Sequence, residues 1–402
     1  MESNSGAIRF VLITAFISTM GASIIIPVIP FIVEKYGAGA LAVNLLVVSF
    51  SLSQFLAVPL LGKLSDRYGR RPILLFSVFG SAIGFLIFGI GGALWMLFLG
   101  RVIDGITGGN ISTVMSTIAD ITPPEKRARQ FALVGAAMGI GLVVGPVIGG
   151  LLSQNGYSLP LFVAAALAFG NFLWGFFVMN ESLPEEKRSK EILTRDLNPF
   201  LQLRDVLEIK ETRNFLVTIF LGTLPISILV ANIALLARDS LHWQPTTIGM
   251  GQLVFGIFAI VTQAWLIRRL LPVLGESRLT IIGLVLEAIG YICFALVYLT
   301  HSNVIVFAGI FCAAIGSGLA DPSIAGLLSA QVGAEKQGLI QGSNGAVQAL
   351  ARIAGPLIGG VLYAAANPAT PFWFAAFALL GATGIFIIFT QRNLITSSKI
   401  AA

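Results

Sequence analysis

Five charged side chains interrupt the long apolar runs of this sequence: Arg101, Asp104, Glu287, Asp321 and Arg352. A charge at bilayer depth costs about 2.5–3.5 kcal/mol on insertion scales, so such a residue persists where it faces a cavity or a partner. Arg101 and Asp104 are three residues apart, which makes them neighbours on one helical face. Proton coupling needs a buried acid, and the candidates are Asp104 tuned by Arg101, Glu287, or Asp321. The alternative for Arg101 and Asp104 is a static ion pair that holds helices together, and a static role is favoured for Arg352.

A second group of residues forms a short loop, GKLSDRYGRRP, at positions 62–72. Its glycines allow a tight turn, and Pro72 suits the first turn of a helix. Cations alone would only anchor the loop at a membrane surface. An acid among them can pair with a neighbouring helix end and break that pair during a conformational change, which favours a gate. The residues of this predicted gate are Gly62, Asp66, Arg67, Gly69, Arg70 and Arg71.

A third pattern lies in residues 139–150, GIGLVVGPVIGG. Gly141, Gly145 and Gly149 recur every four residues and leave a groove for close helix contact. Pro146, which precedes Gly149 and Gly150, bends the helix and frees a carbonyl group. We expect this helix to pack between two halves of the molecule, where packing also controls gating.

The elements that must position these residues are membrane helices. Of 402 residues, 56% are apolar and only 11% are charged, against about 25% in a soluble domain. A spanning helix needs about 20 apolar residues, and twelve runs qualify. They lie near residues 8–33, 42–61, 73–93, 94–118, 131–153, 160–179, 215–237, 246–267, 279–299, 304–329, 340–364 and 372–390. The predicted fold is therefore an all-α membrane protein of twelve helices.

Lys and Arg set the orientation of these helices. With the N-terminus inside, the outer loops hold only Lys35 and Arg238, so both termini are predicted to be cytoplasmic. The stretch 180–213 is polar and divides the chain into a bundle at 1–179 and a bundle at 214–402. It is predicted to be either an amphipathic helix on the inner leaflet or a solvated tether.

The two halves are copies of each other. Residues 125–152 and 335–362 match at a constant offset of 210, which aligns Gly145-Pro146 with Gly355-Pro356. The same offset carries Asp66 onto Glu276. A run of matches in one register indicates duplication, and duplicated membrane halves place a binding site between them near the midplane.

No phosphate-binding loop, nucleophile–base pair or metal cluster is visible in the sequence, so neither an enzyme nor a cofactor is expected. The basic residues occupy short loops, which argues against nucleic acid as a partner. Energy is therefore expected to come from an ion gradient.

At these motifs the chain resembles the major facilitator superfamily, specifically its twelve-helix drug:proton antiporters, and most of all the tetracycline exporters. Further matching stretches are Pro27-Val28-Ile29-Pro30, Gln54, LWMLFLGR at 94–101, IADIT at 118–122 and TTIG at 246–249. The resemblance implies that Asp66 and Arg70 form a cytoplasmic gate with Asp120, and that Arg101 takes part in proton transfer. It also places Glu287 where those exporters carry an aspartate in helix 9.

The chain departs from that family at three positions. Ser18, Gly84 and Ala259 stand where the tetracycline exporters carry two intramembrane aspartates and a histidine. Magnesium-chelated tetracycline is therefore not the expected substrate, although export by the same mechanism is. The resemblance implies that helices 1, 4, 7 and 10 line the cavity, so Asp104 and Asp321 are expected to face each other across it. The residues expected at the substrate cavity are Gln54, Asn110, Asp321 and Arg352.

The sequence thus predicts a monomeric, proton-driven exporter of small amphiphilic molecules or drugs in the inner membrane. Its partners are lipid, protons and a small-molecule substrate. Uptake or facilitated diffusion of a small metabolite is the alternative transport function. A membrane receptor without transport activity is a third interpretation, which the intact gate loop and the buried acids oppose.

Overall fold

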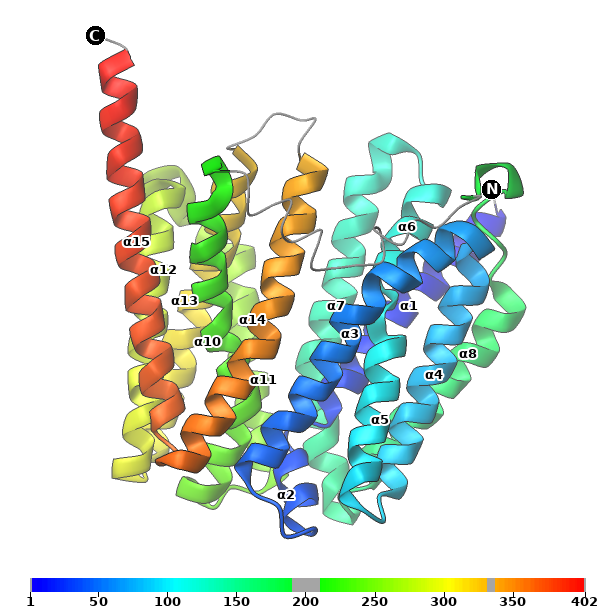
Figure 1. Ribbon diagram of the computed structural model, residues 1–402, viewed down its shortest axis with the longest axis horizontal. Coiled ribbons are helices and arrows are strands. Elements are labelled where there is room, and N and C mark those ends of the chain that lie inside the picture. The colour runs from blue at the N-terminus through cyan, green and yellow to red at the C-terminus, as the bar shows by residue number, and fades with distance from the viewer. Residues whose placement is uncertain (1, 190–209, 331–336, 401–402) are drawn as a thin grey trace. The chain divides into compact units, whose positions relative to one another are not determined.

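The computed structural model describes residues 2–189, 210–330 and 337–400, and all regular structure in these ranges is helical (Figure 1). The predicted amphipathic helix of the linker falls largely on residues outside these ranges. The helices in chain order are α1 (Glu2–Ile24), α2 (Ile29–Glu34), α3 (Ala40–Tyr68), α4 (Arg70–Ile90), α5 (Leu94–Thr107), η1 (Gly108–Asn110), α6 (Ile111–Ile121), α7 (Pro124–Leu152), η2 (Ser153–Asn155), α8 (Leu159–Val178), η3 (Glu185–Lys187), α10 (Lys210–Leu241), α11 (Pro245–Val261), η5 (Thr262–Leu266), α12 (Ile267–Thr300), α13 (Asn303–Ala330), α14 (Gln337–Ala365) and α15 (Thr370–Ile400).

These helices correspond to twelve membrane crossings. Ten continuous helical stretches within the described residues are long and apolar enough to span a bilayer. The stretch 245–300 is one run of 56 residues, enough for two crossings, and it contains a non-helical glycine at Gly275. The predicted span 94–118 is divided into α5 and α6, each too short to be counted alone. Adding one crossing for each of these two cases gives the predicted twelve.

Local sequence explains two of the helix boundaries. The predicted first span, 8–33, is not one helix, because α1 ends at Ile24 and α2 begins at Ile29. Pro27 and Pro30 lack a backbone N–H and interrupt the hydrogen-bond ladder there. The boundary between α4 and α5 lies at Gly91-Gly92, where both glycines have positive φ angles of 63° and 90°. A residue with a side chain is strained in that conformation.

The chain forms two compact units. Unit 1 comprises residues 1–199 with 244–253, and unit 2 comprises 200–243 with 254–402. The start of α11 therefore packs with unit 1, although it follows α10 in the chain. The bundle limits at residues 179 and 214 remain predictions.

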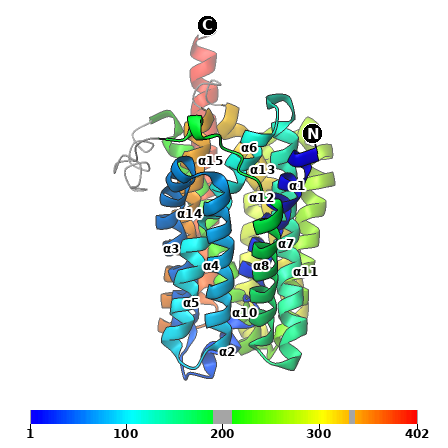
Figure 2. The same cartoon turned by 90° about the vertical axis from the view of Figure 1, so that its right-hand side faces the viewer.

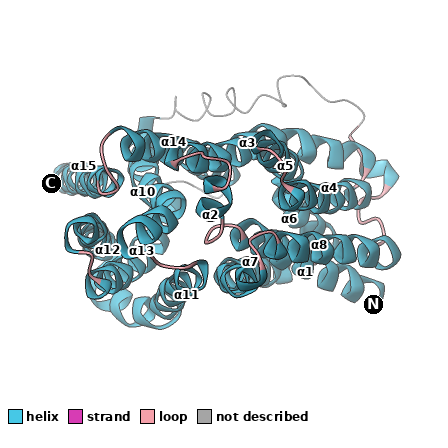
Figure 3. Ribbon diagram, turned by 90° about the horizontal axis from the view of Figure 1, so that it is seen from below, coloured by secondary structure: helices cyan, strands magenta, loops and turns pink. Residues whose placement is uncertain are grey.

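Helix pairs repeat between the units, as the duplication predicts. In unit 1, α1 packs against α7, and α4 packs against both α5 and α8 (Figure 2). In unit 2, α10 packs against α14, and α12 packs against both α13 and α15 (Figure 3). The matching glycines have matching neighbours: Gly145 lies against Ser23 of α1, and Gly355 lies against Ser227 of α10. Both units thus use one packing scheme.

Candidate functional site

The ion pair of Arg101 and Asp104 lies inside unit 1 on α5. Their side chains are joined by Nη1 and Oδ2 at 3.2 Å, and the two residues are only 5% and 3% exposed. The guanidinium lies 4.2 Å from the centroid of the Phe50 ring, and its Nε donates to the carbonyl of Leu46 at 3.5 Å. The cation is therefore held between α5 and α3 by one carboxylate, one ring face and one long hydrogen bond.

Asp104 also faces α4. Its carboxylate accepts a hydrogen bond from Ser81, and the Ser81 hydroxyl lies 3.3 Å from that of Thr107. Gly84 of α4 packs directly on Asp104, because a Cβ added at Gly84 would lie 2.9 Å from the Asp104 Cβ. Gly84 is the position at which the resemblance places a family aspartate. In this chain the acid at that helix contact comes from α5 instead of α4, and the glycine makes room for it.

The predicted gate residues form a charged cluster at one end of unit 1. Arg70 bonds to Asp66 and, through Nε, to Asp120 at 3.0 Å. Its Nη1 also donates to the Ser65 hydroxyl at 2.7 Å. Arg70 is itself buried. One guanidinium thus joins the end of α3, the start of α4 and the end of α6.

The remaining residues of the loop have separate roles in the structure. Gly69 is the junction of α3 and α4, with a φ of 104° that disfavours any side chain. Arg71 donates to the carbonyl of Phe176 at 2.7 Å and lies over its ring, whereas Arg67 lies over the ring of Tyr68. Gly62 faces Ser112 of α6 at ordinary contact distance.

Glu181 was not predicted as a site residue, and the structure places it at the start of α4. Its carboxylate accepts from the backbone N–H of Arg70 at 2.8 Å and from that of Arg71 at 3.2 Å. It also accepts from the N–H groups of Ser182 and Leu183. The first N–H groups of a helix lack partners within the helix, and an acid there also suits the helix dipole. The beginning of the linker is thereby attached to the gate cluster.

The glycines of α7 contact α1 and the start of α11. Added Cβ atoms at Gly141, Gly145 and Gly149 would meet backbone atoms of α1, the first being 2.6 Å from the carbonyl of Phe16. These three glycines therefore pack within the first half of the chain. Gly150 contacts Pro245 and Thr246, and Pro146 contacts Gly249, at the start of α11.

The remaining candidates lie in both units. Gln54 donates from Nε2 to the carbonyl of Gly108 at 3.0 Å, and Asn110 is buried two residues further along. Glu287 is buried on α12, and Asp321 lies on α13, the helix that packs against α12. Asp321 and Arg352 are both exposed. The expected approach of Asp104 to Asp321 depends on the relative placement of the two units and remains a prediction.

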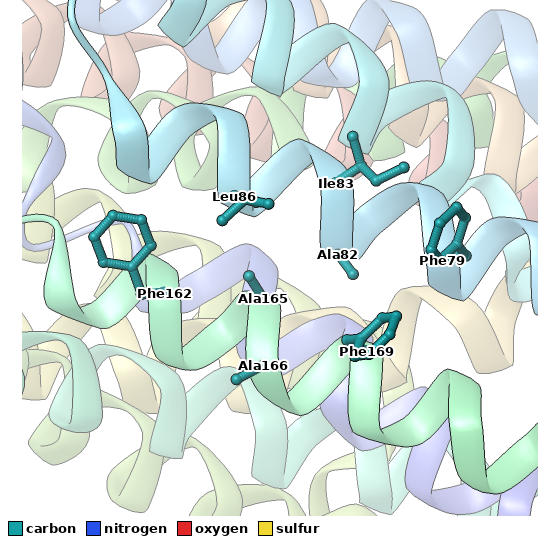
Figure 4. A pocket seen from close by; sticks show the side chains of 8 residues that line it. All are labelled: Phe79, Ala82, Ile83, Leu86, Phe162, Ala165, Ala166 and Phe169. Carbon is teal, nitrogen blue, oxygen red and sulfur yellow. The ribbon is translucent and has the colours of Figure 1, made fainter.

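A groove of about 420 Å³ runs between α4 and α8 (Figure 4). All eight side chains that line it are apolar: Phe79, Ala82, Ile83, Leu86, Phe162, Ala165, Ala166 and Phe169. Ligand sites of this size usually carry a few polar groups that orient the ligand. This groove has none, so we do not assign the substrate to it.

Paired apolar bundles with buried charges inside membrane spans define a polytopic secondary transporter. The family model of the Major Facilitator Superfamily matches residues 11–270 and again residues 215–399. The chain is 35% identical to the class C tetracycline resistance protein of Escherichia coli over 368 residues, which covers 91% of each chain. It is 26% identical to multidrug resistance protein 2 of Bacillus subtilis, covering 94% of each. This chain belongs to the Major Facilitator Superfamily.

Solved structures share the fold at low sequence identity. A bacterial homologue of the human lysosomal transporter Spinster, in an inward-facing and occupied conformation, matches with a TM-score of 0.78 at 15% identity, covering 97% of each chain. The human organic anion transporter MFSD10 matches with a TM-score of 0.71 at 22% identity, covering 95% of this chain and 99% of that one.

Proposed function

We propose that this protein exports a small amphiphilic molecule in exchange for protons, by alternating access. The observation that carries the proposal is the Arg101–Asp104 pair, an acid buried inside a membrane span beside a single cation. The relatives named for resistance to tetracycline or to several drugs support export over uptake. Asp104 would bind a proton in one state of the cycle and pair with Arg101 in the other.

The gate cluster supports the alternating-access part of the proposal. Arg70 joins three helix ends, so breaking its bonds to Asp66 and Asp120 would free these ends to move. The asymmetry of Lys and Arg along the sequence supports a cytoplasmic position for this end, with both termini on that side. In this proposal the cluster closes the inner side of unit 1 while the pump is open outward.

The proposed substrate is an amphiphile other than the magnesium–tetracycline chelate. Gly84 and Ser18 carry no carboxylate to bind a metal chelate. Asp104 lies beside Gly84, but it is already paired with Arg101, so it is poorly placed to bind a cation as well. Glu287 and Asp321 of unit 2 are the proposed acids for a cationic substrate or a second proton. We propose a monomer that uses the proton gradient and no cofactor.

Transport in proteoliposomes tests this function. Protein is reconstituted with a pH dye inside, a pH gradient is imposed, and tetracycline and ethidium are added as separate probes. An antiporter moves protons opposite to the probe, a symporter moves them with it, and a receptor moves neither. Asp104→Asn should abolish the probe-dependent proton signal, while Glu34→Gln, which neutralises an exposed acid of α2, should retain it. Normal coupling in Asp104→Asn would remove Asp104 from the mechanism.

A further inference from the structure

A line of polar side chains runs along the broken helix from α5 to α6, inside unit 1. It begins at the buried acid Asp104 and ends at the gate acid Asp120, and its members recur every three or four residues. They are Asp104, Thr107, Asn110, Thr113, Thr117 and Asp120. Sixteen residues of helix at 1.5 Å each place the two acids about 24 Å apart along the axis.

The short turn η1 keeps these polar side chains on one face of the helix. Gly109 leaves helical geometry with a ψ of 16°, and residues 108–110 form a 3₁₀ turn. Side chains three residues apart eclipse one another in a 3₁₀ turn, whereas in an α-helix they drift around the axis. The turn therefore helps Thr107, Asn110 and Thr113 to share one face. Gln54 holds the turn through the carbonyl of Gly108.

Helix α4 runs antiparallel along that face. Gly80 packs on Thr107, with an added Cβ 2.9 Å from the Thr107 Cβ, and at the far end Arg70 bonds to Asp120. Ser77, one turn before Gly80 and Ser81, comes level with Asn110 in this register. The hydroxyl groups of Ser77 and Ser81 on α4 add to the row of polar side chains on α5 and α6.

Three atoms of this line are buried without a partner among the described residues. They are Ser77 Oγ, Asn110 Nδ2 and Thr113 Oγ1. Ser77 and Thr113 are 0% exposed and Asn110 is 4% exposed. A buried polar group without a hydrogen bond costs about 1–3 kcal/mol, and groups of this kind are commonly satisfied by ordered water. Thr107 and Thr117 differ, because their hydroxyls donate to carbonyls of their own helix at 2.8 and 2.7 Å.

We propose that Ser77, Asn110 and Thr113 bind ordered water molecules that conduct protons between Asp104 and the gate pair of Arg70 and Asp120. We call the three residues the water-binding seam. This inference rests on the proposed proton coupling and adds the route by which the proton leaves. The charged groups along it are Arg101 beside Asp104 at one end, and Arg70 with Asp66 and Asp120 at the other.

The transfer balances at every step. Protonated Asp104 gives its proton to the first water, each water or hydroxyl accepts one proton and passes one on, and the last water releases a proton at the gate. Asp104 is left as a carboxylate, which Arg101 stabilises across 3.2 Å. No bond other than O–H is made or broken, and no electron is transferred.

A pH-jump experiment on the purified full-length protein tests the route without any substrate. The probe is the proton on Asp104, followed by the infrared C=O stretching band that Asp104→Asn removes. Ser77→Ala and Thr113→Val should slow the decay of this band after an alkaline jump by about tenfold or more, with the same final amplitude. Thr113→Ser, which keeps the hydroxyl, should restore the wild-type rate. Thr19→Val is the matched control, because that hydroxyl bonds to Ala15 within α1 and faces Gly141 of α7.

Three results would overturn the proposal. Wild-type rates in both Ser77→Ala and Thr113→Val would show that the proton takes another route, and the proposed function would stand. Equal slowing in Thr19→Val would make the effect general and not local to the seam. A protein without any band that depends on Asp104 would refute both the route and the role of Asp104 in coupling.

Discussion

The contact between Gly84 and Asp104 predicts that the acid can be moved from α5 to α4, but only if both positions change together. A Cβ at residue 84 would lie 2.8 Å from the carbonyl oxygen of Gly100 and 2.9 Å from the Asp104 Cβ. Favourable carbon contacts are about 3.5–4.0 Å, so α4 and α5 would have to separate. Overpacking of this kind costs about 1–3 kcal/mol. Gly84→Asp alone also places a second carboxyl group beside the first, which adds repulsion.

The opposite single change is destabilising for another reason. Asp104→Gly leaves the guanidinium of Arg101 buried without its carboxylate, and breaking a buried pair from one side costs about 3–5 kcal/mol. In the double variant Gly84→Asp with Asp104→Gly, the acid returns from the other helix and one of three close contacts disappears, while those with the Gly100 carbonyl oxygen and the backbone nitrogen of residue 104 remain. The costs of the single changes should therefore not add, and we expect a coupling energy of about 2–3 kcal/mol in favour of the double variant.

Unfolding of the four proteins in detergent, followed by tryptophan fluorescence, measures that coupling energy. Probe-driven proton movement in proteoliposomes measures function, and the double variant should recover part of the signal that Asp104→Gly loses. Gly170→Ala, in α8 where an added Cβ meets nothing within 4 Å, is a control for a general effect of substituting glycine. A double variant whose loss equals the sum of the single losses would refute the idea that residues 84 and 104 supply one shared acid position.

Three further predictions concern the same unit. Asp120→Asn should leave Arg70 with fewer ionic partners and raise uncoupled proton leak in proteoliposomes, while the protein still elutes as a single species. Glu181→Gln should weaken the cap on α4 and lower the free energy of unfolding by about 0.5–2 kcal/mol; an unchanged value together with unchanged transport would exclude a role for the cap. Gly145→Val should separate α7 from α1 and cost about 1–3 kcal/mol or prevent folding, whereas Gly139→Val, where an added Cβ meets nothing within 4 Å, should be tolerated.

Helix content and duplication were predictable because they depend on local composition. Runs of about 20 apolar residues have to be helical in lipid, since every backbone group must find a partner within its own segment. The helix break at Gly91-Gly92 was predictable too, because it depends on the two glycines themselves. The break inside the span 94–118 was not predicted, because a 3₁₀ turn at Gly108–Asn110 needs the amide of Gln54, 54 residues away, to stabilise it.

The charged cluster at the gate was predicted from the sequence only in part. Asp66, Arg70 and Asp120 were predicted together, and the structure places them within ion-pair distance. Glu181 was missed, because its partners at the start of α4 are more than 100 residues earlier in the chain. A sequence signal existed in the acid three residues after the helix that ends at Val178, but its target could not be identified without the fold.

The sequence alone determined that this chain spans a membrane in two related halves, that charged residues lie inside those spans, and that the loop at 62–72 carries a gate-like motif. Those properties follow from hydropathy, spacing and repetition, which are read along the chain. Only the tertiary structure decided which helix faces which: α1 against the glycines of α7, and Asp104 against the missing side chain of Gly84. Helix pairing depends on close contact between residues distant in sequence, so the neighbours of Asp104, and the buried polar atoms of Ser77, Asn110 and Thr113, could be identified only after the helices were packed.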